Sequence, residues 1–380
     1  MDRKIFNEEH QLFRKTFRQY LEKKIIPHLE TWDEAHMVPR EVWLEAGEQG
    51  WLCPTASKQY GGLECDFLYS VIIQEELAYA GASSVSWGLH SDIVLPYIEN
   101  FGSEAQKQKW IPKCISGECV LAIAMTEPAV GSDLANLKTR AVRQGDHYIV
   151  NGAKVFISNG QCADLYIVAV RTEDTNPPHR GVSLLLIEGN TPGFQRGRNL
   201  KKIGMQGQDT SELFFEDCKV PVENLLGKEG MGFKYLMNNL QQERLVIAIG
   251  AVGAAKGALK HTIDYVKTRE IFGKPLSKFQ NTQFELAEMS TQVQIGQSFI
   301  DDLLPRHMAG ENVVTEVSMA KYWTTDMQFE VSDRCLQLFG GYGYMQEYPI
   351  SRFFVDARVQ RIYGGANEVM KDLVARGLGL

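Results

Sequence analysis

The chain has 380 residues, of which 44% are apolar and 23% charged, a composition that excludes intrinsic disorder as the main state and allows two or three domain cores. No apolar run approaches the roughly 20 residues of a membrane-spanning helix, so we expect no integral membrane segment. The net charge of −7 argues against nucleic acid as the main partner.

Residues 1–118 are expected to form an α-helical domain. Apolar side chains from Leu12 to Ile25 recur every three to five positions between charges, the pattern of an amphipathic helix that stops near Pro27. The charges interleaved here are unlike a secretory signal or an acid-poor transit peptide, which favours a bacterial cytoplasm, with a processed mitochondrial matrix chain as the alternative. Helical spacing returns, between Gly and Pro residues, at 40–50, 67–81, 88–101 and 104–116.

Residues 119–225 are expected to form a β domain. Asn151-Gly152 separates two β-prone runs, which predicts a hairpin turn at that dipeptide. Three more runs of strand length follow, with turn residues between them, at 163–170, 181–188 and 211–220.

Residues 226–380 return to helical spacing, so the order along the chain is helix, sheet, helix. This order predicts an α+β fold that is mostly α, unlike the alternating βαβ pattern of dinucleotide-binding folds. The sequence contains no G-x-G-x-x-G, G-x-x-x-x-G-K-[ST], H-E-x-x-H or G-x-S-x-G motif. Seven cysteines, odd in number and without C-x-x-C spacing, predict neither a disulfide framework nor a metal site. The expected long helices span 230–268, 276–305, 311–340 and 366–376.

Four segments carry a shared signature in the middle and C-terminal parts of the chain. They are AMTEPAVGSDLANLKTRA (124–141), VFISNG (155–160), TREIFGK (268–274) and QLFGGYGY (337–344). At these spacings the chain resembles the acyl-CoA dehydrogenase family nearly end to end, and is most similar to its long-chain subclass. The resemblance implies an N-terminal helical domain, a middle β domain of barrel-like or sandwich form and a C-terminal four-helix bundle, assembled as a homotetramer.

The resemblance also implies FAD as the cofactor. The loop after residue 124 would line the flavin ring and the start of the acyl-CoA, with Phe156 and Ser158 against the other side of the ring, where many members have Trp and Thr. Arg269 is suited to bind the FAD pyrophosphate because its planar guanidinium can bond two phosphate oxygens at once. Part of this binding group would come from a neighbouring subunit. The residues implied in cofactor binding are Met125, Thr126, Gly131, Ser132, Phe156, Ser158, Arg269, Phe272, Gln280, Gln337, Gly340, Gly341, Asn367 and Glu368.

The family reaction needs a carboxylate that removes the α-proton while the β-hydrogen leaves as hydride to the flavin. Many members place a Glu directly after the Tyr of the motif RIYGGANEV, but this chain has Gly364 there. Glu243 precedes an uncharged run at 245–255 that predicts a buried helix and a raised carboxyl pKa. The resemblance to the long-chain and isovaleryl subclasses implies Glu243 as the base. Glu368 is the rival carboxylate, although a role at the helix start is the simpler interpretation.

Backbone groups are implied in the same site. Gly364 would direct its N–H at the thioester oxygen, where negative charge develops. Ala366 stands where Thr is frequent, and the backbone amides of Asn367 and Glu368 would replace the lost flavin contact. The residues implied in substrate contact are Ser132, Gln241, Arg244 and Gly365.

The implied function is flavin-dependent dehydrogenation of a fatty acyl-CoA, long-chain by subclass, to trans-2-enoyl-CoA, with electron-transferring flavoprotein as the electron acceptor. Two alternatives stay open. One is the same chemistry on a short branched acyl-CoA such as isovaleryl-CoA. The other is a non-catalytic assembly protein that binds FAD and acyl-CoA, because the usual base position holds no side chain.

Overall fold

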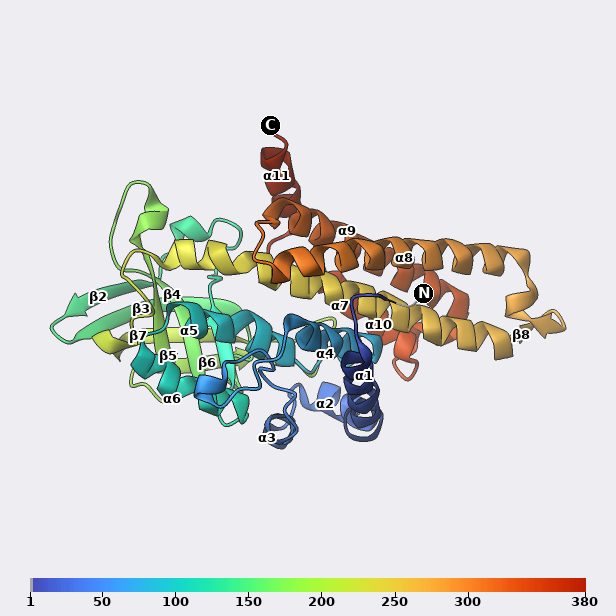
Figure 1. Ribbon diagram of the computed structural model, residues 1–380, viewed down its shortest axis with the longest axis horizontal. Helices are drawn as coiled ribbons and strands as arrows, with labels where there is room; N and C mark the ends of the chain where they lie inside the picture. The colour runs from blue at the N-terminus through green and yellow to red at the C-terminus, as the bar shows by residue number, and fades with distance from the viewer. Residues whose placement is uncertain (1–2) are drawn as a thin grey trace.

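The chain folds into three consecutive parts, helical, sheet and helical, in the computed structural model, which describes residues 3–380 (Figure 1). The sheet occupies one end of an elongated molecule, the last helices extend away from it, and the first helices lie along one side (Figure 1). The N-terminal helices are α1 (Glu8–Tyr20), α2 (Leu29–Ala35), α3 (Arg40–Glu48), α4 (Phe67–Tyr79), α5 (Leu95–Phe101) and α6 (Glu104–Ile115).

Local signals explain where these helices begin and end. Asn7 and Ser103 cap α1 and α6 with capping boxes, each accepting a hydrogen bond from the third residue of its helix. The first helix expected from the sequence is interrupted, since α1 passes into a π-helical turn (Leu21–Ile25) and a 3₁₀ turn (Ile26–His28) before α2. The helix expected at 88–101 likewise divides into a π-helical stretch (Leu89–Val94) and α5, in which Pro96 lies in the first turn.

The middle part is one curled seven-stranded sheet. Its order is β1-β4-β2-β3-β7-β6, with β5 paired to β4. β1 and β4 run parallel, whereas the β2–β3, β3–β7, β4–β5 and β6–β7 pairs are antiparallel. The strands are β1 (Leu121–Ala124), β2 (Arg140–Gln144), β3 (His147–Ser158), β4 (Leu165–Arg171), β5 (Val182–Glu188), β6 (Phe194–Asn199) and β7 (Thr210–Pro221).

The hairpin predicted at Asn151-Gly152 is wrong. Both residues lie inside the continuous strand β3, and the register against β7 shifts between Val150 and Gly152, as in a β-bulge. The turn falls earlier, at Gly145-Asp146, because Gln144 pairs with His147 and Gly145 adopts a φ of +63°. Gly152 is needed for close approach, since a Cβ there would lie 2.6 Å from the hydroxyl of Thr139.

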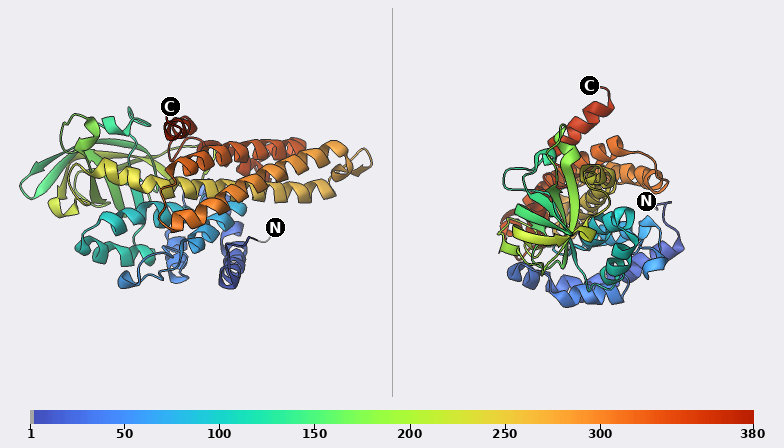
Figure 2. Two further views of the ribbon diagram at one scale, coloured as in Figure 1. Left: turned by 45° about the horizontal axis from the view of Figure 1, so that its top comes forward. Right: turned by 90° about the vertical axis from the view of Figure 1, so that its left-hand side faces the viewer.

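The C-terminal part is built on three long helices that run side by side (Figure 2). α7 is the one helix among residues 3–380 long and apolar enough to cross a membrane, but 78% of its most apolar window is buried, as in a core helix. The helix α10 was not expected from the sequence. The elements are α7 (Gly232–Thr268), β8 (Glu270–Ile271), β9 (Lys274–Pro275), α8 (Gln280–Met308), α9 (Val314–Phe339), α10 (Pro349–Gln360) and α11 (Asn367–Gly377), and the remaining 3₁₀ turns cover 58–60, 134–136, 178–181, 222–224, 276–278 and 340–344.

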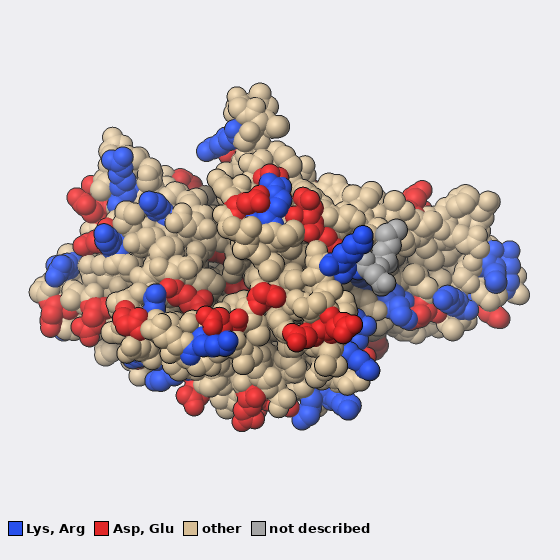
Figure 3. Space-filling view, in the orientation of Figure 1, with Lys and Arg blue, Asp and Glu red and all other residues tan. Residues whose placement is uncertain are grey.

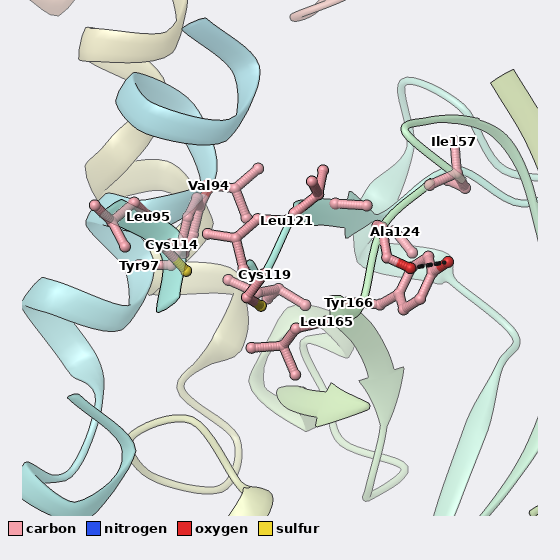
Figure 4. Packing of buried hydrophobic residues seen from close by; sticks show 14 of the residues in the cluster. Val94, Leu95, Tyr97, Cys114, Cys119, Leu121, Ala124, Ile157, Leu165 and Tyr166 are labelled. Atoms are coloured by element: carbon pink, nitrogen blue, oxygen red, sulfur yellow. Dashed lines mark hydrogen bonds between the residues drawn. The ribbon is translucent and has the colours of Figure 1, made fainter. Parts of the chain in front are cut away.

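Two apolar cores join the three parts. One core unites the N-terminal helices with the sheet, and Figure 4 shows Val94 of the helical side beside Leu121 of the sheet. The other core joins α1 and α4 to α7, α8 and α9. All seven cysteines are free thiols and five of them are buried. The N-terminal helices therefore pack on both the sheet and the helical bundle, and they fix α7 relative to the sheet.

Candidate active site

Glu243 is a buried carboxylate on α7. Its residue is only 4% exposed, and its Oε1 accepts a hydrogen bond of 2.6 Å from the hydroxyl of Tyr97 on α5. Burial raises the pKa of Glu243 from 4.5 to about 7, against the opposing effects of the Tyr97 hydrogen bond and the positive charge of Arg244. No ion pair joins Glu243 to Arg244 among the residues described, 3–380. A carboxyl group with this pKa can accept a proton and release it near neutral pH.

The turn around Gly364 packs against the same part of α7. Gly364 has a φ of +63°, and a Cβ built on it would lie 2.2 Å from Cδ1 of Ile247, one helical turn beyond Glu243. Arg244 donates from Nε to the carbonyl of Gly364 at 3.4 Å. The N–H of Gly364 has no hydrogen-bond partner within residues 3–380. A side chain at position 364 would thus meet α7, while the backbone donor stays free.

The start of α11 is tied to α9. Lys321 donates from Nζ to the carbonyl of Gly365 at 2.8 Å and to Oδ1 of Asn367 at 3.0 Å. The N–H of Asn367 donates to the carbonyl of Arg361, and its side chain is buried. The Asn367 amide is therefore already bonded inside the chain, and its expected contact with the cofactor stays a prediction. Glu368 is exposed to solvent, at the first turn of α11.

The loop after β1 is anchored by a buried ion pair. Lys154 on β3 is 0% exposed, and its Nζ lies 2.8 Å from Glu127 and 3.0 Å from the carbonyl of Met125. The carbonyl of Thr126 accepts from the N–H of Val155 at 3.0 Å, so the loop lies beside β3. Beyond this anchor the chain opens to solvent at Gly131 and Ser132, and a Cβ on Gly131 would meet nothing within 4 Å.

Phe156 projects from the same strand. It is 67% exposed and has a φ of +60°, at a second register shift between Lys154 and Ile157. A positive φ is an outlier for an aromatic residue, and such strain persists at ligand-binding sites. Ser158 is half-buried two residues further on, opposite Thr210 of β7. An exposed ring, a nearby hydroxyl and an open glycine loop fit one side of a planar ligand such as a flavin.

A second group of expected cofactor residues lies at the far end of the long helices. Arg269 follows α7 directly, 26 residues after Glu243, which is roughly 39 Å along the helix. Its guanidinium lies 5.3 Å from the ring centre of Tyr342. Phe272 is 93% exposed with a φ of +49°. Figure 3 shows basic side chains gathered at this end. The other members are exposed as well: Gln280, Gln337, Gly340 and Gly341.

Gln241, which was expected to contact the substrate, is hydrogen-bonded inside the chain. Its Nε2 bonds to Nδ1 of His307 and to the carbonyl of Glu311, each at 3.1 Å, and its Oε1 accepts from the N–H of Val313 at 2.9 Å. Both ends of the amide are thus used to hold the connection between α8 and α9. The Gln241 amide is therefore engaged within the chain, and its expected contact with the substrate stays a prediction.

Three residues that support the site were missed from the sequence: Tyr97, Lys154 and Lys321. The partner of each residue is distant in the sequence and comes close only through the fold. The sequence pattern around each residue indicates only a helix or a strand. The one available signal for Lys154 was its place directly before the apolar run 155–157 of a strand, because lysine is almost never fully buried without a partner.

Comparisons with known proteins agree along the whole chain. Three family models match it: Acyl-CoA dehydrogenase, N-terminal domain, at 7–118, middle domain at 122–218 and C-terminal domain at 230–379. The chain is 47% identical over 375 residues to the mitochondrial long-chain specific acyl-CoA dehydrogenase of Mus musculus, covering 98% of this chain and 87% of that protein. It is 37% identical over 374 residues to the mitochondrial isovaleryl-CoA dehydrogenase of Pongo abelii, covering 97% and 88%. The crystal structure of acyl-CoA dehydrogenase from Geobacillus kaustophilus superposes with a TM-score of 0.98, at 55% identity and with 100% of both chains covered.

Proposed function

Since this chain belongs to the acyl-CoA dehydrogenase family, we propose that it converts a long-chain fatty acyl-CoA to the trans-2-enoyl-CoA with Glu243 as the base. It is an FAD-dependent oxidoreductase. The observation that carries the proposal is a buried carboxyl with a pKa of about 7, one helical turn from Ile247, which occupies the space beside Gly364. Because Glu243 and Ile247 lie one turn apart on the same face of α7, this packing supports the proposal that Glu243 acts where other members use a glutamate at position 364.

The residues have separate tasks in this reaction. The α-proton of the thioester passes to the Glu243 carboxylate, and the electron pair of that C–H bond forms the new double bond as the β-hydrogen leaves with its own pair. FAD, when bound, accepts that hydride. The free N–H of Gly364 would donate to the thioester oxygen, which would make the α-proton more acidic. Arg244 holds the Gly364 carbonyl and so fixes the direction of that donor.

The expected cofactor residues form two groups that lie at different ends of the chain. Met125, Thr126, Gly131, Ser132, Phe156 and Ser158 belong to the sheet end, whereas Arg269 to Gly341 lie at the distal end of α7, roughly 39 Å beyond Glu243. We propose that the distal group contacts the FAD of a second copy in a homotetramer. Sedimentation velocity of the wild type and of Arg269→Ala, with and without FAD, tests this. A monomer that holds FAD as tightly as the wild type would refute it.

The long-chain preference is supported by the higher identity to a long-chain specific enzyme than to an isovaleryl-CoA enzyme, 47% against 37%. Electron-transferring flavoprotein is the proposed electron acceptor, and a bacterial cytoplasm the proposed location, with the mitochondrial matrix as the alternative. The assembly-protein alternative loses support because Glu243 supplies a carboxyl with a suitable pKa.

The test is anaerobic bleaching of the flavin absorbance by palmitoyl-CoA and by isovaleryl-CoA. Glu243→Gln should bind acyl-CoA but reduce the flavin at least about a hundredfold more slowly, at the lower end expected for loss of a positioned general base. Glu368→Gln is the matched control and should reduce at the wild-type rate. Equal rates for Glu243→Gln and the wild type would exclude Glu243 as the base. Faster bleaching by isovaleryl-CoA would replace the long-chain assignment, and no bleaching by either substrate would favour the assembly protein.

A further inference from the structure

Tyr97 is the one hydrogen-bond partner of the Glu243 carboxyl among residues 3–380. We propose that Tyr97 is a positioning residue for the base: its hydroxyl holds Oε1 of Glu243, so that Oε2 is the atom that takes the α-proton. The inference rests on the proposed function of Glu243 and assigns different tasks to the two oxygens of its carboxyl group.

The geometry of Tyr97 suits a fixed donor. The residue is 0% exposed on α5, and its neighbours Val94, Leu95 and Ile98 are also fully buried, so the ring is held by the apolar core (Figure 4). The distance of 2.6 Å from Oη to Oε1 is short, as expected for a hydroxyl donating to a carboxylate. Because core side chains rarely leave their packed rotamers, the hydroxyl fixes the rotation of the Glu243 carboxyl group.

Tyr97 is the residue of α5 that affects the pKa of Glu243, and the charged groups around the carboxyl belong to other helices. Arg244 of α7 is the cation whose charge lowers the pKa of Glu243, and burial lowers the pKa of Arg244 itself. Lys321 of α9 faces Arg244 and bonds to Gly365 and Asn367. Burial raises the pKa of Tyr97 well above its usual value, so its hydroxyl stays protonated and remains a donor.

The hydrogen bond has a predictable effect on the pH dependence. A donor to the charged form of a carboxyl lowers its pKa, and among the influences on Glu243 this bond is the largest that acts in that direction. Without the Tyr97 hydroxyl, this opposition to the effect of burial is lost, so the pKa of Glu243 rises. The ionised fraction at pH 7 then falls, and the rotation of the carboxyl group is no longer fixed.

The experiment compares Tyr97→Phe with the wild type in the FAD-loaded enzyme. Stopped-flow flavin reduction by palmitoyl-CoA should be roughly tenfold slower at pH 7, the cost of one hydrogen bond to a charged group, with acyl-CoA affinity nearly unchanged. The acidic limb of the rate profile should move to higher pH. The carboxyl band of Glu243 in infrared difference spectra, assigned by its absence in Glu243→Gln, should titrate at higher pH in Tyr97→Phe.

Tyr166→Phe is the matched control. Tyr166 is fully buried, and its hydroxyl shares its one proton between the carbonyls of Gly160 and Ala163 and accepts from Nε of Arg196. Its replacement therefore also removes a buried, hydrogen-bonded hydroxyl but should leave the rate profile unchanged. A Tyr97→Phe enzyme that is less stable but has an unshifted acidic limb and infrared titration would overturn the positioning role. Wild-type rates in Glu243→Gln would instead refute the proposed base, which keeps the two failures distinct.

Discussion

Replacing Gly364 by alanine tests how closely the turn at 361–366 is packed on α7. At the φ of +63° an alanine costs roughly 1 kcal/mol more than glycine. Its Cβ would lie 2.2 Å from Cδ1 of Ile247, and overpacking adds about 1 kcal/mol, because Cδ1 ends a side chain that can rotate away. Gly364→Ala should therefore lower the free energy of unfolding by about 2 kcal/mol.

Ile247→Val removes Cδ1 alone and should cost about 1 kcal/mol. In the double variant the clash is absent, so the total loss should be about 2 kcal/mol in place of the additive value of about 3 kcal/mol. Denaturant unfolding of the four FAD-loaded proteins, followed by tryptophan fluorescence, measures the coupling. Costs that add within about 0.4 kcal/mol would show that the two residues do not touch, and would refute the packing of Gly364 on α7.

Three further predictions concern buried ionisable groups. The rate of flavin reduction should rise with pH through about 7, because Glu243 must lose its proton to act as the base, and a rate independent of pH between 5 and 9 would contradict this. Burial raises the pKa of Asp92 to about 7, and its Oδ1 has no hydrogen-bond partner within residues 3–380, so the folded protein retains a proton there that the unfolded chain releases near pH 4. The contribution of protonated Asp92 to the free energy of unfolding is complete below pH 4 and is lost as pH rises through 7. Asp92→Asn should therefore be more stable than the wild type at pH 8, by on the order of 2 kcal/mol. Denaturant unfolding of both proteins at pH 4 and at pH 8 measures this difference. Lys154→Met strands the buried carboxylate of Glu127 and should cost about 3 kcal/mol while weakening FAD binding, which fluorescence titration of the apoprotein with FAD would reveal; unchanged FAD affinity would show that the loop after β1 does not depend on this anchor.

Local patterns predicted much of the fold. The long helical periodicity at 230–268 matches α7, and the strand-length runs at 163–170 and 181–188 match β4 and β5. The order helix, sheet, helix is confirmed, as is the family indicated by the four signature segments. The predictions failed where local turn composition conflicts with the strand pairing that the fold adopts. Asn151-Gly152 has the composition of a hairpin turn, but Gly145-Asp146 makes the turn and Gly152 serves a bulge.

The sequence by itself determined the family, the missing glutamate at position 364 and the candidate Glu243, because residue identity and spacing are properties of the chain. Only the tertiary structure decided what surrounds that carboxyl group. Tyr97 reaches Glu243 across 146 positions, and Lys321 reaches Gly365 across 44. The same packing committed Gln241 to the connection between α8 and α9 and the Asn367 amide to Arg361. Hydrogen-bond partners and burial depend on which elements meet in space, and these set the pKa of Glu243.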